Sequence, residues 1–143
     1  MRVVAVDPGL RRTGVALSDG SGTLASPYAT LRGASLRAQW AELVALISRL
    51  QAEDDGLTAI VVGVPVRLDG SDTDMTAQAR GLAERLGRRF AVPVVPLDER
   101  LTSVEAESRL AMTERDWRKR KDKLDAAAAA VLLQDYLDAQ ARG

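Results

Sequence analysis

One stretch of the sequence, from Leu57 to Val64, is apolar at nearly every position and constrains the fold more than any other segment. It reads Leu-Thr-Ala-Ile-Val-Val-Gly-Val, has the length of a strand, and ends at Pro65. A strand with one face in water alternates apolar and polar residues, so a continuous run indicates a strand buried on both faces. We therefore expect a central sheet covered by helices.

The first 31 residues predict three strands joined by tight turns. Residues 2–6 are a short apolar, β-branched run that stops at a turn signal, Asp7-Pro8-Gly9. Residues 13–18 form the second predicted strand, and the Asp-Gly-Ser-Gly sequence at 19–22 favours a hairpin. The third strand is expected somewhere in residues 23–31.

The rest of the chain predicts strands that alternate with helices, from the spacing of apolar residues and from stop and cap signals. The predicted elements are a helix over 36–51, the strand 57–64, a polar loop over 67–74, a helix around 77–86 that stops at Gly87, a strand over 92–97, a helix from Thr102 or Ser103 to about Leu110 or Met112, and an Ala- and Leu-rich helix over 126–139.

This order of elements predicts an α/β fold. A three-strand antiparallel meander would run into two parallel strands, giving a mixed five-stranded sheet flanked by helices. We interpret residues 1–143 as a single domain, because the chain is too short for two lobes that close over a cofactor.

The composition excludes several kinds of catalysis. The sequence has no His and no Cys, which removes disulfides, thiolate zinc sites, Cys nucleophiles, His general bases and Ser-His triads. No apolar run approaches the roughly 20 residues of a membrane span, and no signal peptide is recognisable. We expect a soluble, cytoplasmic protein without a membrane partner, whose catalysis would use carboxylates, Lys, Arg, hydroxyls or a bound metal.

Two carboxylates lie just beyond the ends of predicted strands. Asp7 follows residues 2–6, and Glu99 lies two positions beyond residues 92–97. Ligand sites of parallel sheets lie outside the carboxyl ends of the strands, so Asp7 and Glu99 are expected to be neighbours. Asp125 begins the last predicted helix, whose first turn could face the same edge.

Three converging carboxylates without a compensating Lys would repel one another, and a divalent cation would neutralise them. Oxygen-only ligands favour Mg²⁺ or Mn²⁺ over zinc and copper, which prefer the His and Cys that this chain lacks. Two such ions roughly 3.5–4 Å apart can activate water and stabilise the leaving oxygen in phosphoryl transfer. The missing His is no obstacle to that chemistry.

Each motif taken alone also has an ordinary structural interpretation. Asp7-Pro8-Gly9 is also a turn, Asp125 is also a helix cap, and Asp98-Glu99-Arg100 is also a surface ion pair with a stability contribution of roughly 0–1 kcal/mol. From spacing alone, these interpretations outweigh a joint metal site.

A basic segment is the clearest local charge in a chain whose formal net charge is zero. Residues 115–123 hold six basic and two acidic side chains. Such a run is either a solvated surface or a contact for phosphates.

Four sets of residues, in order, resemble one family. They are residues 4–19 (Val-Ala-Val-Asp-Pro-Gly-Leu-Arg-Arg-Thr-Gly-Val-Ala-Leu-Ser-Asp), residues 61–65 with Leu-Asp-Gly at 68–70, residues 94–106 around Asp-Glu-Arg, and residues 125–137 ending in Leu-Leu-Gln-Asp-Tyr-Leu. Together they span nearly the whole chain and resemble the YqgF (RuvX) family. That family comprises bacterial Holliday junction resolvase-like nucleases with a ribonuclease H-like fold, which are also described as candidate pre-16S ribosomal RNA processing nucleases.

The resemblance implies a metal-dependent nuclease. Asp7 matches the first-strand Asp of the family's metal site, Glu99 the Glu of its Asp-Glu-Arg motif, and Asp125 the Asp that opens its last helix. It also implies a nucleic-acid partner, with the basic segment beside the site, and the residues assigned to phosphate contacts are Arg11, Arg12, Arg100, Arg118, Lys119, Arg120, Lys121 and Lys123.

This sequence departs from the commoner family pattern at two places. Asp7-Pro8-Gly9 replaces Asp-Phe/Tyr-Gly, and five alanines follow Asp125 where bulkier apolar residues are frequent. Neither departure removes a carboxylate, so neither puts the expected activity in doubt.

Two rival functions remain open at this point. An Asp-x-Gly hairpin also resembles the phosphate-binding hairpin of actin-like ATP-binding proteins. Those proteins have two lobes, however, which need more than twice the length of this chain. A non-catalytic nucleic-acid module is the other rival, against which the retention of all three carboxylates argues. The substrate, the mode of cutting and the choice between monomer and homodimer are undetermined, because the stripe of Leu43, Ile47 and Leu50 could be core or interface.

Overall fold

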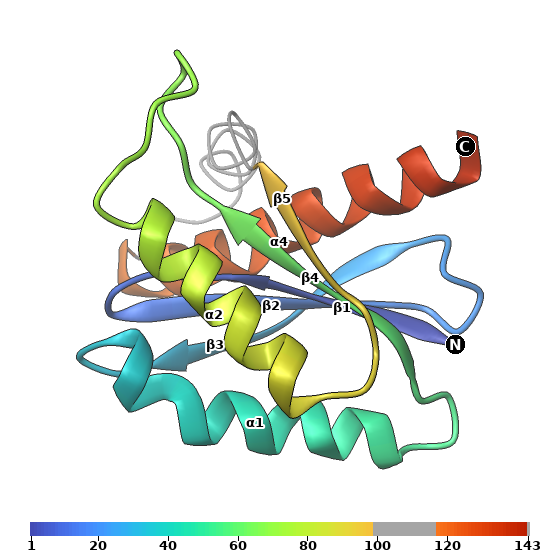
Figure 1. Cartoon of the computed structure of the whole chain (residues 1–143). Helices are drawn as coiled ribbons and strands as arrows, with labels where there is room; N and C mark the ends of the chain where they lie inside the picture. Colours follow the sequence, from blue (N-terminus) through green and yellow to red (C-terminus); the bar gives the residue numbers. More distant parts are fainter. Residues whose placement is uncertain (99–116, 143) are drawn as a thin grey trace.

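A mixed five-stranded sheet separates two layers of helices in the computed structural model, which describes residues 1–98 and 117–142 (Figure 1). The strand order is β3-β2-β1-β4-β5. β1 pairs antiparallel with β2, which pairs antiparallel with β3, whereas β1, β4 and β5 are parallel. The predicted meander and its two parallel strands are confirmed. The strands are β1 (Arg2–Asp7), β2 (Arg12–Ser18), β3 (Ala25–Arg32), β4 (Leu57–Val64) and β5 (Val94–Asp98).

The helices cover both faces of this sheet. α1 (Leu36–Ala52) and α2 (Thr76–Arg89) lie on one face, and α4 (Trp117–Arg142) crosses the other (Figure 1). None of the helices in residues 1–98 and 117–142 is long and apolar enough to cross a membrane.

β4 is buried on both faces, as its continuous apolar sequence predicts. Ile60 and Val62 pack into the core beneath α1 and α2, while Ala59 and Val61 pack against α4. The core beneath α1 also contains the stripe of Leu43, Ile47 and Leu50. That stripe is therefore core and not an interface.

The structure corrects the predicted ends of α2 and β5. α2 continues past Gly87 to Arg89, where the buried Phe90 follows it. β5 begins at Val94 and not at Val92, because Pro93 between them has no N–H for the ladder. The helix predicted from Thr102 or Ser103 lies outside the described residues.

The largest correction concerns the last helix, which begins at Trp117 and not at residue 126. Residues 117–125 contain no Gly or Pro, and six of the nine are Arg, Lys or Leu, all good helix formers. The apolar stretch after Asp125 thus continues a helix that the basic segment starts.

The turn between β2 and β3 is held by the Asp19 carboxylate. Its Oδ1 accepts hydrogen bonds from the backbone N–H groups of Thr23 (2.8 Å) and Leu24 (3.1 Å), and its Oδ2 accepts one from the Ser21 hydroxyl. These bonds favour the ionised form and lower the pKa of Asp19 below its ordinary value of 3.8, the Thr23 bond having the largest effect.

The hairpin should therefore loosen only in acid. Because the folded pKa is depressed, the stabilising contribution of Asp19 is present above pH 3.8 and is lost as the pH falls through the folded pKa. An NMR titration of the Thr23 and Leu24 amides should report a midpoint below 3.8. A midpoint at or above that value would contradict the assignment, and Asp19→Ala should abolish the transition.

Candidate active site

The carboxyl ends of the three parallel strands meet at one edge of the sheet. Val6 of β1 pairs with Val62 of β4, and Val62 pairs with Pro96 of β5. The last residues of these strands, Asp7, Val64 and Asp98, therefore lie along the same edge. We call it the carboxyl edge.

Asp7 lies on the α4 face of the sheet at this edge. Alternate residues of a strand point to opposite faces, and Val3 and Ala5 belong to the apolar cluster that packs against α4. Asp7 is the next residue of that series and is half-buried. The strand alternation thus directs the Asp7 side chain toward the layer that carries Asp125.

Gly14 brings the backbone of α4 onto the sheet beside Asp7. Gly14 is the Cα partner of Asp7 in the β1–β2 ladder, and a Cβ built on Gly14 would lie 1.8 Å from the carbonyl oxygen of Asp125. Only a residue without a side chain allows so close an approach. Asp7 and Asp125 are therefore brought together at the same face and the same edge, although 117 residues separate them in the sequence.

Asp125 does not begin a helix, contrary to the sequence-based expectation. It lies more than two turns inside α4 and therefore does not cap it. Figure 1 shows the first turns of α4 at the same side of the molecule as the turn between β1 and β2. The packing of α4 on Gly14, and not a helix terminus, gives Asp125 its place.

Arg12 forms an ion pair with Asp125. Its Nε lies 3.0 Å from Oδ2 of Asp125, and both side chains are about two-thirds or more buried. Arg12 and Gly14 are alternate residues of β2, so both face α4. Arg12, which was predicted to contact nucleic acid, thus contacts a predicted metal ligand, whereas Arg11 beside it is exposed.

The remaining predicted site residues are only partly visible. Glu99 and Arg100 lie outside the described residues, one and two positions beyond the end of β5. The backbone of Arg118, Lys119, Arg120, Lys121 and Lys123 belongs to the first two turns of α4, directly before Asp125, and their side chains are not described. Within the described ranges, no three acidic residues gather as a metal-binding group.

A buried amide that the sequence-based analysis missed holds the turn after Asp7. Gln39 of α1 is 2% exposed, and its Nε2 donates to the carbonyl oxygens of Gly9 (3.2 Å), Leu10 (3.3 Å) and Gly33 (3.4 Å). Its Oε1 accepts a hydrogen bond from the buried Thr13 hydroxyl. The signal was present in the sequence: a polar residue four positions before Leu43, within the apolar stripe of the helix.

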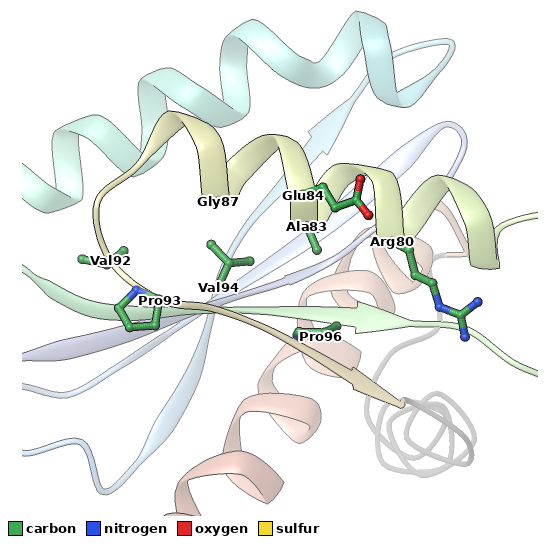
Figure 2. A pocket seen from close by; sticks show the side chains of 8 residues that line it. All are labelled: Arg80, Ala83, Glu84, Gly87, Val92, Pro93, Val94 and Pro96. Carbon is green, nitrogen blue, oxygen red and sulfur yellow. The ribbon is translucent and has the colours of Figure 1, made fainter.

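Two grooves lie next to β5. One, of about 540 Å³, runs between α2 and β5 and is walled by Ala83, Val92, Pro93 and Val94 (Figure 2). Figure 2 shows Arg80 at the end of this groove nearest the tip of β5. A second groove of about 320 Å³ continues from Arg80 to Asp98 at the carboxyl edge. The apolar lining of the first groove suits binding and not proton transfer, so the carboxylates on the α4 face remain the candidate catalytic groups.

Comparison with known proteins identifies one family over nearly the whole chain. Residues 1–139 match the model of the family described as RuvX, Holliday junction resolvase. A protein of Maridesulfovibrio salexigens is 38% identical over 137 residues, which are 96% of this chain and 98% of that protein. A protein of Thiobacillus denitrificans is 40% identical over 138 residues, covering 96% and 92% of the two chains. Both relatives carry the name "Putative pre-16S rRNA nuclease".

Solved structures show the same fold at low sequence identity. Thermus thermophilus RuvC in complex with a Holliday junction substrate aligns with a TM-score of 0.56 and 15% identity, covering 99% of this chain and 96% of that one. The yeast mitochondrial Holliday junction resolvase Ydc2 aligns with a TM-score of 0.51 and 14% identity, covering 98% and 79%. The predicted ribonuclease H-like fold is confirmed.

Replacing Gly14 should separate the two layers of the site. In Gly14→Ala the added methyl group overlaps the Asp125 carbonyl, so we expect a loss of about 1–3 kcal/mol in the free energy of unfolding, measured in urea. The control is Gly81→Ala in α2, where no heavy atom lies within 4 Å of an added Cβ. Alanine should leave stability unchanged there or raise it by up to about 1 kcal/mol. Equal effects of the two substitutions would refute the close contact.

Removing the Gln39 amide should destabilise the turn that follows Asp7. Gln39→Leu leaves three backbone carbonyls and the Thr13 hydroxyl without this partner, at a cost of about 1–3 kcal/mol in unfolding free energy. Gln51→Leu, at an exposed position of the same helix, should change stability by less than about 0.5 kcal/mol. Hydrogen exchange at Gly33, whose N–H donates to the Arg11 carbonyl, should accelerate only in Gln39→Leu.

Proposed function

The chain belongs to the RuvX family of Holliday junction resolvase-like nucleases, and from that premise we propose that it hydrolyses phosphodiester bonds in RNA or structured DNA with Mg²⁺ or Mn²⁺ held by Asp7, Glu99 and Asp125. The observation that carries the proposal is the meeting of Asp7 and Asp125 on one face of the carboxyl edge, through Gly14. Glu99 is the residue that follows β5 in the sequence.

The donor set fits a hard divalent cation. Asp7 and Asp125 offer carboxylate oxygens alone, and the chain has no His or Cys to attract a softer metal. Arg12 compensates part of the charge of Asp125 through its contact with Oδ2. A single arginine does not balance three carboxylates, so a cation would stabilise their convergence.

The chemistry that such ions supply when bound is the activation of water and the stabilisation of the leaving oxygen. The chain's own side chains hold the carboxylates in position for this chemistry. Asp7 is fixed by the strand and by the turn that Gln39 holds. Arg12 orients Asp125 through their ion pair, and a guanidinium that is paired at Nε keeps its other N–H groups with which to bind a phosphate. The basic segment of α4, which leads directly to Asp125, would contact the nucleic-acid backbone without reading its sequence.

A precursor of 16S rRNA is the first substrate to test. The relatives named "Putative pre-16S rRNA nuclease" are 38–40% identical to the chain over almost their full length. The structure solved with a Holliday junction shares 15% and supports the fold alone. A junction resolvase would also be expected to act as a symmetric dimer that makes paired cuts, whereas RNA processing sets no such requirement.

Conservative replacement of the carboxylates should abolish cleavage without unfolding the protein. We expect Asp7→Asn, Glu99→Gln and Asp125→Asn each to lower the rate on labelled pre-16S rRNA with Mg²⁺ or Mn²⁺ by about a hundredfold or more, because each weakens the hold on the ions. Asp138→Asn, an exposed position of the same helix α4, is the matched control and should cleave at the wild-type rate.

The same assay on a four-way DNA junction separates the two substrate classes. If the Asp7 and Asp125 variants cut as fast as wild type on either substrate, the proposed site is wrong. If wild type cuts neither substrate with either ion while it binds both, the non-catalytic alternative holds.

A further inference from the structure

A third groove, on the opposite face of the sheet from Asp125, gathers arginines from two helices. It has a volume of about 360 Å³ and lies between α1 and α2. Arg37 of α1 lines it together with Arg85 and Arg88 of α2, and all three are exposed. We call it the α1–α2 arginine groove.

The charges of this groove are not compensated within the described chain. Arg2, Arg12 and Arg80 each form an ion pair with a carboxylate, whereas Arg37, Arg85 and Arg88 form none with residues 1–98 or 117–142. Glu84 is the acidic residue of the lining, so three positive charges face one negative charge. The groove therefore attracts anions although the whole chain is neutral.

Arg85 is held in place by an aromatic ring. Its guanidinium carbon lies 4.1 Å from the centroid of the Trp40 ring, and Trp40 packs against the apolar core. Stacking on a ring leaves the N–H groups at the edge of the guanidinium available. That planar fork matches a phosphate, and its immobilisation reduces the entropy lost on binding.

The groove begins beside the turn that follows Asp7. The Gly33 N–H donates to the Arg11 carbonyl (3.1 Å), and Gln39 bonds to Gly9, Leu10 and Gly33. Arg37 lies between Gly33 and Gln39 in the sequence, on the first turn of α1. The exposed Arg11, which directly precedes β2, therefore neighbours the start of α1, and a strand that leaves the edge past Arg11 would meet Arg37 next.

We propose that the α1–α2 arginine groove binds the backbone phosphates of the nucleic-acid strand that continues beyond the carboxyl edge. This inference rests on the proposed function, because that function supplies the nucleic acid that the groove would bind. It does not depend on cleavage of that nucleic acid. Contacts from exposed guanidinium groups favour any phosphodiester backbone, so the groove adds affinity and positions the strand without selecting a sequence. A strand long enough to reach the groove is therefore expected to bind more tightly than a short one.

The test compares two pairs of substitutions that remove the same charge. Arg37→Gln/Arg88→Gln acts in the groove and keeps the Arg85–Trp40 stack, while Arg49→Gln/Arg142→Gln removes two exposed arginines outside it. Binding of labelled single-stranded RNA is measured by anisotropy in the Asp7→Asn background, without divalent metal, over a series of salt concentrations.

We expect the groove pair to weaken binding of a long RNA by about tenfold and to reduce the slope of log affinity against log salt by about 1.4, or 0.7 for each lost contact. A short RNA that covers only the carboxyl edge should bind the groove pair and the control pair equally. Glu84→Gln should strengthen binding of the long RNA, because it removes the negative charge of the lining.

Equal affinities and equal slopes of the two pairs on the long RNA would overturn the inference, as would absence of binding to both RNA and a DNA junction. Wild-type cleavage with Mg²⁺ or Mn²⁺ is scored separately. If wild type cleaves but the two pairs bind the long RNA equally, the groove is refuted and the proposed function stands. If the pairs differ in RNA affinity but wild type does not cleave, the groove stands and the proposed function is refuted.

Discussion

The contact between Gly14 and the backbone of α4 at Asp125 determines how the two layers of the site are assembled. A Cβ at this position would lie 1.8 Å from the Asp125 carbonyl, so any other residue would push the helix away from β2. Because Gly14 is also the ladder partner of Asp7, the same contact sets the relation between two carboxylates of different layers. The ion pair of Arg12 with Asp125 depends on it as well, since Arg12 reaches the helix from the same strand face.

The two faces of the sheet contribute different things to this edge. The α4 face carries Asp7, Asp125 and the basic first turns of the helix. The opposite face carries the buried amide of Gln39, which ties the turn after Asp7 to the turn before α1, and the arginines between α1 and α2. A chain with no net charge thereby carries acidic and basic side chains in local groups around this edge, where local fields and not the total charge govern binding.

Sequence likeness and structural likeness support different statements about this chain. Identity of 38–40% over nearly full-length relatives places it in the RuvX family of nucleases. Alignment with RuvC at 15% identity and a TM-score of 0.56 shows a similar fold and no more. What the fold supplies in this chain is an edge where three parallel strands end together, and the side chains placed there decide the chemistry.

Local sequence determined the strands, most of the helices and the position of Asp7, because apolar alternation, turn residues and helix spacing act over a few neighbouring residues. The continuous run over 57–64 predicted burial on both faces, and the turn signal at Asp7-Pro8-Gly9 predicted a carboxylate at a strand end. The start of α4 was predicted too late, since an apolar pattern marks the buried part of a helix and not its beginning. Only the tertiary structure decided that Asp125 lies against Gly14, that Gln39 reaches the turn after Asp7, and that arginines of two helices share one groove. Each of these contacts joins residues of different elements. Such contacts form only when the layers pack together, so no short segment of the sequence specifies them.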